Sequence, residues 1–281
     1  GAGANDDLSN NYNSGFGYQA LNANTAGGNN TAIGYQAGKT LLTGSNNLAL
    51  GSYALSNSGH SLSGSNVALG VFSLQGKSGG AGSSTNTGLG YGTLRYINGG
   101  GSNLAVGANS MLGNGTDGIT GNSNTGVGAY SMTSLTSGGY NAAVGYSSLS
   151  LNTTGYYNSA LGYYAGRYIA DGATGNTTGD YNVFLGTNTK AFADNDQNEI
   201  VIGYNAIGVG SNSVVLGSDS IITTALKGNV GIGTTSPGAK LHVSGTASDD
   251  LLRLSDSSNE SINFIDFEVG GYRRMAIKGH A

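Results

Sequence analysis

The sequence predicts an all-β fold, a repetitive parallel β-roll or β-solenoid, on three observations. Glycine supplies 52 of the 281 residues and proline only one, so turns are frequent and tight. A short unit, Asn, any residue, a small residue, a large aliphatic residue and Gly, returns along most of the chain. Its usual spacing of 17 residues is too short for a strand plus a helix.

The glycine that closes each unit shows the period most clearly. These glycines are Gly17, Gly34, Gly51, Gly70, Gly90, Gly107, Gly128, Gly145, Gly162, Gly186, Gly203, Gly217 and Gly233. The intervals return to 17, lengthen where segments are inserted and shorten near the C-terminal end. We therefore predict coils of about 17 residues, each with two short strands and two turns, and coils of 14–16 residues towards the end. The G-x-G-x-x-A run at Gly15 is one copy of this repeat and not a dinucleotide site.

Two apolar positions in each unit are the expected core. The first is the large aliphatic residue before the glycine, namely Ile33, Leu50, Leu69, Leu89, Val106, Val127, Val144, Leu161 and Leu185. The second follows five residues later, as in Leu55 or Met132, and is replaced by Gly38 and Gly166 in two copies. Two anchors make a thin core, so we expect an obligate homo-oligomer that associates through the small Ala and Gly face, with a homotrimer as the favoured state.

Composition restricts the partners. Only 9% of the residues are charged and the net charge is -4, which argues against a nucleic-acid partner. No apolar run approaches the ~20 residues of a membrane span. There is no cysteine for a disulfide or thiolate metal site. Because the chain starts at Gly1, we expect a processed product or a fragment of a longer protein.

Two stretches resemble known families. "NSVVLG", residues 212–217, resembles the head repeats of trimeric autotransporter adhesins, and "LKGNVGIGTTSPGAKLHVSG", residues 226–245, is similar to a connector in bacteriophage tail-fibre proteins, often upstream of a self-cleaving chaperone domain. The resemblance implies a trimeric, non-enzymatic surface fibre, on a virion tail or at a cell surface. The chaperone domain is not in this sequence, so no cleavage residues are carried over.

Four regions are expected from these patterns. They are a roll of 17-residue repeats with loop insertions over 1–190, shorter adhesin-head-like repeats over 191–228, the connector over 229–245 and a β-rich module over 246–281. The last region holds ten charged residues from Asp249 to Lys278. Its alternating runs predict strands, with a hairpin turn at Gly270 and Gly271.

Candidate sites are few. Insertions at 56–65, 75–85, 112–123 and 167–181 should emerge from one edge and contact a cell-surface glycan or protein receptor. The candidate contacts on or beside them are His60, Lys77, Asp117, Tyr168 and Asp171.

Three other patterns have structural interpretations. Asp194 and Asp196 resemble the start of a calcium-binding loop, but a turn is the favoured interpretation. Asparagine at each coil start favours a side-chain ladder. Tyrosines recurring at one repeat position could hold sugars, although rows that cover the turns are the preferred interpretation.

The favoured function is a structural and adhesive fibre that spaces and presents receptor-binding surfaces. We expect no enzymatic activity and no cofactor, because no catalytic set of Ser, His and Asp is visible. The alternative is a homopolymeric extracellular filament without a receptor. A carbohydrate-degrading β-solenoid and an ice-binding protein rank lower, because the repeats are poor in acids and the expected threonine row is irregular.

Overall fold

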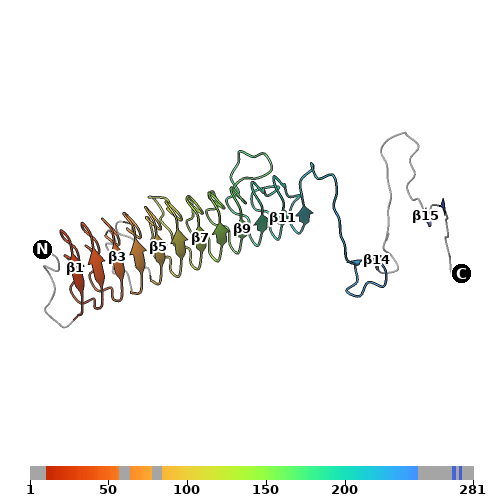
Figure 1. The fold of residues 1–281 in the computed structure, drawn as a ribbon. Helices are drawn as coiled ribbons and strands as arrows, with labels where there is room; N and C mark the ends of the chain where they lie inside the picture. The colour runs from red at the N-terminus through yellow and green to blue at the C-terminus, as the bar shows by residue number, and fades with distance from the viewer. Residues whose placement is uncertain (1–10, 57–63, 78–83, 246–267, 270–271, 274–281) are drawn as a thin grey trace. The chain divides into compact units, whose positions relative to one another are not determined.

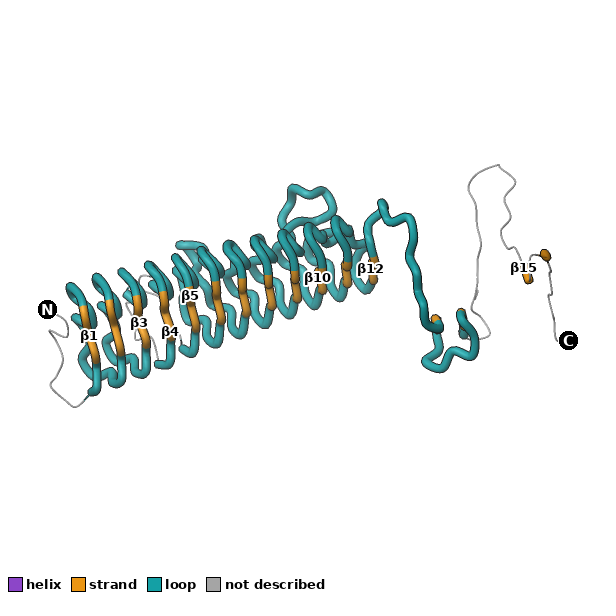
Figure 2. Tube along the Cα trace, in the orientation of Figure 1, coloured by secondary structure: helices purple, strands orange, loops and turns teal. Residues whose placement is uncertain are grey.

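The computed structural model describes residues 11–56, 64–77, 84–245, 268–269 and 272–273. It is all-β, as predicted: the described residues between 14 and 216 form a β-solenoid, and the described part of the chain contains no helix (Figures 1 and 2). Twelve parallel strands lie side by side in chain order in one sheet. They are β1 (Ser14–Phe16), β2 (Thr31–Ile33), β3 (Leu48–Leu50), β4 (Val67–Leu69), β5 (Thr87–Leu89), β6 (Leu104–Val106), β7 (Thr125–Val127), β8 (Ala142–Val144), β9 (Ser159–Leu161), β10 (Val183–Leu185), β11 (Ile200–Ile202) and β12 (Val214–Leu216).

Equivalent repeat positions are aligned between neighbouring coils. Val127 pairs with Val144, and Val144 pairs with Leu161. The 14-residue repeat keeps the same register, with Ile200 opposite Val214. One sheet therefore continues through residue 190, where the sequence suggested a change of region, and the compact unit ends at Ile221.

Each coil has one strand, not the two that its length suggested. The remainder is built of turns, and in these the second apolar anchor adopts a left-handed backbone, as in Leu55 (φ 52°) and Met132 (φ 45°). Such a conformation costs roughly 1–2 kcal/mol for a residue with a Cβ. Hydrogen bonds between coils oppose this cost: the Leu55 N–H donates to the Ser73 carbonyl and the Met132 N–H to the Ser148 carbonyl, at 3.1 and 3.0 Å.

A buried asparagine ladder connects the coils, as the sequence favoured. The Oδ1 atom of each asparagine accepts the backbone N–H of the equivalent residue in the next coil, at 2.8–3.0 Å. The ladder residues are Asn13, Asn30, Asn47, Asn66, Asn86, Asn103, Asn124, Asn141, Asn158 and Asn182, and Glu199 is the final donor. The amide nitrogen of Asn124 also donates to the carbonyl of Gly138, at 3.0 Å, so one side chain joins two parts of the coil.

The glycine after each strand is required by both conformation and space. Gly145 has φ 136°, a region that other residues rarely adopt. A Cβ at this position would fall on the carbonyl oxygen of Gly162 in the next coil. The same contact repeats from coil to coil, which explains why glycine marks the period of the sequence.

The first expected set of core residues is wrong in its orientation. In β2 to β9 the small middle residue of the strand, such as Ala143 or Ala160, points into the coil and is buried. The large aliphatic residue that follows points outwards: Val144 is 39% exposed and Leu161 52%. All nine residues predicted as inward anchors, Ile33, Leu50, Leu69, Leu89, Val106, Val127, Val144, Leu161 and Leu185, occupy this outer position and are exposed or half-buried. The interior is too narrow for two large side chains per coil, so the small residue takes the inner place.

The second anchor position is confirmed as core. Leu21, Leu55, Leu74, Leu94, Met111, Met132 and Leu149 are all at most 2% exposed. Where glycine replaces the anchor, another side chain fills the space. A Cβ added to Gly38 would lie 3.1 Å from Leu41, which is buried, and one added to Gly166 would lie 2.5 Å from the ring of the buried Phe184.

Residues 222–281 form a separate unit in which the structure describes two small strand pairs. β13 (Val230–Ile232) and β14 (Leu241–Val243) are parallel. β15 (Glu268–Val269) and β16 (Tyr272–Arg273) are antiparallel, with Val269 opposite Tyr272, as the predicted hairpin requires. The two glycines of that hairpin, and most of the charged module, lie outside the described residues.

The ladder can be tested with Asn124→Ala. This change removes the acceptor of the Asn141 N–H and the donor to the Gly138 carbonyl in a buried site. At about 1–3 kcal/mol for each of the two unsatisfied groups, we expect the free energy of unfolding to fall by about 2–6 kcal/mol in urea denaturation. The exposed Thr116→Ala is the control and should change it by less than about 0.5 kcal/mol. Equal stability of the two variants would contradict a supporting role for the ladder.

Phe184 fills the space that a leucine anchor at Gly166 would occupy, and this can be tested by giving both positions the residues of the other repeats. Phe184→Ala should cost about 3–5 kcal/mol, because it leaves a cavity, and Gly166→Leu alone should clash with the ring. Together they recreate the pairing of Leu149 with Ala160, so the double variant should recover most of the lost stability in urea denaturation. A double variant no more stable than Phe184→Ala would show that the two positions do not share one space.

Candidate functional site

The outer face of the sheet is an unusual apolar surface. The third residue of each strand, from Phe16 in β1 to Leu216 in β12, is large and apolar in all twelve strands. Because parallel strands are in register, these side chains form one continuous row along the solenoid. The row of first residues is mixed, with Thr125, Ala142 and Ser159 among the polar or small members.

The expected contact between chains, the small Ala and Gly face, is not available on the surface. The small Ala and Gly residues are enclosed within each coil, so they cannot form the contact between chains. The aliphatic row instead provides the exposed surface. A shallow depression of about 250 Å³ crosses β8 to β10 on this face and is lined by Val144, Leu161, Val183 and Leu185 among others.

A second candidate surface lies on the turns and is aromatic. One continuous row of rings, alternately stacked and edge-on, has neighbouring centroids 5.3–5.8 Å apart and consists of Tyr18, Tyr35, Tyr53, Phe72 and Tyr91. In a separate row, Tyr140, Tyr157 and Tyr181 stack nearly parallel at 4.9 and 5.1 Å. The first row contains the predicted Tyr18, Tyr35 and Tyr91, whereas the second row was not predicted. Most members of both rows are exposed.

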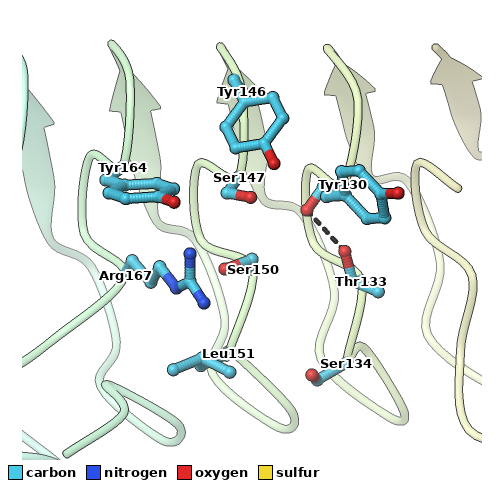
Figure 3. A pocket seen from close by; sticks show the side chains of 9 residues that line it. All are labelled: Tyr130, Thr133, Ser134, Tyr146, Ser147, Ser150, Leu151, Tyr164 and Arg167. Carbon is cyan, nitrogen blue, oxygen red and sulfur yellow. Dashed lines mark hydrogen bonds between the residues drawn. The ribbon is translucent and has the colours of Figure 1, made fainter. Parts of the chain in front are cut away.

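A further aromatic group surrounds a groove of about 320 Å³ (Figure 3). Tyr130, Tyr146 and Tyr164 come from three consecutive coils and form one wall, with ring centroids 5.7 and 5.8 Å apart. Arg167 extends beneath them towards Ser150. The remaining lining residues are Thr133, Ser134, Ser147 and Leu151.

Arg167 is held against aromatic rings. Its guanidinium carbon lies 4.5 Å from the ring centroid of Tyr164 and 4.8 Å from that of Tyr168. The pKa of Tyr164 is lowered by a hydrogen bond from Tyr163 and by the nearby guanidinium, whereas the same bond raises the pKa of Tyr163. The cation and the rings thus form one electrostatic unit.

An adjoining cavity of about 470 Å³ shares Tyr164 with this groove. Tyr168, a predicted receptor contact, lines it together with Lys190 and Tyr204. Sequence reasoning singled out Tyr168 but not Arg167 or Ser150. Both directly follow the second anchor position, and this shared repeat position was the only signal that could have placed them side by side.

The other predicted contacts lie elsewhere. His60 falls outside the described residues. Lys77 lies beside Gly118 of the 112–123 insertion. In this insertion the Asn114 side-chain amide donates to the Asp117 carboxylate at 2.9 Å and accepts the Asp117 backbone N–H.

Asp171 belongs to the 167–181 insertion, which projects between β9 and β10 in Figure 1. A hydrogen bond from the Thr174 hydroxyl lowers the pKa of Asp171, whose carboxylate also accepts two backbone N–H groups. Asp171 thus organises its own loop.

The acids near residue 196 stabilise turns. Burial acts to raise the pKa of Asp194, but hydrogen bonds from the backbone and hydroxyl groups of Thr177 and Thr178 together lower it below its usual range. Asp196 accepts the Ala193 N–H at 2.7 Å and the Ser211 hydroxyl at 2.9 Å. Within the part of the chain that the structure describes, no three metal-ligating side chains of the Asp, Glu, His and Cys types converge.

Glu199 takes the asparagine position at the end of the ladder. Its side chain is fully buried, and its carboxylate accepts the N–H groups of Gly210 and Phe192 at 2.9 and 3.3 Å. Burial raises its pKa, the backbone donors oppose the rise, and Asp196 adds to it.

Comparisons with known proteins give no family. No protein-family model, no curated protein and no solved structure matches this chain. None of the described residues belongs to a helix long and apolar enough to cross a membrane.

Glu199 should make stability depend on pH. In the unfolded chain a glutamate loses its proton near pH 4.3, whereas the folded chain retains this proton to higher pH. The Glu199 contribution to the free energy of unfolding should therefore decrease as pH rises from about 4.3 through the higher folded pKa.

The measurement is the difference between the wild type and Glu199→Gln in urea denaturation from pH 4 to pH 8. Gln cannot titrate, so the variant should gain relative stability as pH rises. Because Asp171 and Asp194 remain in both proteins, their opposite contributions cancel. A pH-independent difference would contradict the raised pKa.

Proposed function

We propose that this protein is a non-enzymatic structural and adhesive fibre, whose copies associate through the aliphatic outer face of the sheet. The observation that carries the proposal is the unbroken row of twelve large apolar residues on an exposed, regular face. The resemblance to trimeric adhesins and tail fibres favours a homotrimer, a closed arrangement with three such faces around one axis. The repeats then set the length of the fibre, and the turns and insertions are presented outwards.

The continuity of this face and its lack of charge favour association. Eleven strand spacings of about 4.8 Å give a length of about 53 Å, and a width of about 10 Å gives an area on the order of 500 Å². Apolar patches of that size on monomers are often functional. Lys and Glu, the residues that usually protect such faces, do not occur at the outer positions of β1 to β12.

The proposed setting is a virion tail fibre or a cell surface, with a glycan or protein receptor. It rests on the resemblance of residues 212–217 and 226–245 to adhesin heads and tail-fibre connectors. The structural uses of the Asp171, Asp194 and Asp196 carboxylates agree with a non-enzymatic role, because their oxygens accept hydrogen bonds within turns.

A homopolymeric filament is the second candidate. Within the described residues, neither β1 nor β12 pairs with another strand on its outer side. Unpaired strand edges are templates for addition of further strands. In a filament, solenoids would stack end to end, and the number of copies would have no fixed limit.

The outer face can be tested with the paired change Val144→Lys and Leu161→Lys. Both side chains already point outwards, so the fold should be retained, while two lysines should prevent burial of the face. Light scattering should give about three times 28.0 kDa for the wild type and 28.0 kDa for the variant.

The matched control is Ala108→Lys, at an exposed position on the turns. It should leave the mass unchanged. A wild-type monomer, or a trimer that survives both lysines, would overturn the proposal. Species of unlimited size would favour the filament.

A further inference from the structure

The repeat places two arginines in similar positions with different partners. Arg95 and Arg167 both follow the second anchor position, and each lies 4.5 Å from an aromatic centroid, of Phe72 and Tyr164 respectively. The preceding coil gives Arg95 a long neighbour: its Nε donates to Gln75 Oε1 at 2.9 Å.

Arg167 has a short neighbour, Ser150, at the equivalent place. The Nε atom of Arg167 and the hydroxyl oxygen of Ser150 are both buried and have no hydrogen-bond partner. Ser150 itself is 95% buried, since its exposed fraction is 5%. A buried polar group without a partner costs about 1–3 kcal/mol, so Arg167 lacks the pairing that Gln75 gives Arg95, and its guanidinium is not committed to the preceding coil.

The groove walls define the chemistry of that molecule. Three tyrosines present flat rings with polar edges, and Thr133, Ser134 and Ser147 add hydroxyl groups. Such surfaces fit sugar rings, which have apolar faces and a polar rim. The described lining residues include one cation, Arg167, and no acid. A guanidinium pairs best with a planar carboxylate through two parallel hydrogen bonds.

The groove is also accessible to such a ligand. It lies on the turn side of the coils of β7, β8 and β9, with the strands behind it in Figure 3. It would remain open when copies meet through the outer face of the sheet. Three coils span about 10 Å, at about 4.8 Å for each spacing, which suits a short run of sugars. The adjoining cavity offers Lys190 as a second cation.

We propose that the groove between Tyr130, Tyr146, Tyr164 and Arg167 binds a carboxylated oligosaccharide, with a uronic-acid-type carboxylate on the Arg167 guanidinium. Sugar rings pack along the tyrosines, and ligand hydroxyls bond the partly exposed Thr133 and Ser134. This inference rests on the adhesive part of the proposed function and specifies its ligand class. It does not require that copies associate.

The test is binding by the intact chain to defined probes in isothermal titration and on an immobilised panel. The probes are tetragalacturonate, hexuronate oligomers from alginate, sialyl-lactose, their methyl esters, and sulfated and neutral oligosaccharides. We expect binding of at least one carboxylated probe and a loss of about 10- to 100-fold on esterification, which removes the charge-assisted hydrogen bonds.

Four variants locate the site. Arg167→Gln and Tyr146→Ala should each weaken binding about 10- to 100-fold. Arg167→Lys should have a smaller effect, because lysine keeps the positive charge but lacks the two parallel hydrogen-bond donors of arginine. Ser150→Gln should also weaken binding: it gives Arg167 the neighbour that Gln75 provides for Arg95. The control is Arg95→Gln, which should leave the affinity within about twofold.

Fold and mass are measured for every variant by thermal unfolding and light scattering. Absence of carboxylate binding by the wild type, equal binding of esters, binding of only sulfated or neutral probes, or no effect of Arg167→Gln would overturn the assignment. A wild type that binds these probes as a monomer would support the groove while refuting the proposed association. A trimeric wild type that binds none of these probes would refute the groove as a binding site while supporting the proposed association.

Discussion

The buried asparagine ladder is the interaction on which the structure depends. Each side chain joins the start of one coil to the backbone of the next, from Asn13 to Glu199. It fixes the register, so every repeat position becomes a row along the solenoid. Small residues then form the inner row, aliphatic residues the outer row and tyrosines a row on the turns. Insertions are tolerated because the strands on either side of them remain aligned, as β9 and β10 do across the 167–181 loop.

Much of this organisation could be predicted from the sequence. The period, the parallel stack, the ladder and the second anchor all follow from spacing and from the hydrogen-bonding capacity of asparagine. The sequence did not predict which side chains of each strand point into the coil and which point outwards. A three-residue strand such as Ala142–Val144 places its middle residue on one face and its ends on the other. Hydrophobicity alone put Val144 inside, whereas the narrow interior accommodates Ala143. The left-handed backbone at Leu55 is equally hidden, because leucine rarely adopts it.

The groove shows a different limit of sequence reasoning. The tyrosine spacing was visible, but the contrast between Arg167 and Arg95 depends on what the preceding coil supplies. Gln75 reaches its arginine and Ser150 does not. In a solenoid such differences appear only when residues about 17 positions apart are compared as neighbours. Variation within an otherwise regular row is therefore where a site is most easily recognised.

The two surfaces have separate roles in this account: the aliphatic face joins copies, and the turns face outwards. Distances between spin labels test this arrangement most directly. The chain has no cysteine, so single labels at Leu161→Cys on the sheet and Ala108→Cys on the turns are unambiguous. The account predicts a short distance between copies for the label at 161 and a distinctly longer one for the label at 108. The reverse order, or no distance between copies at either position, would contradict it.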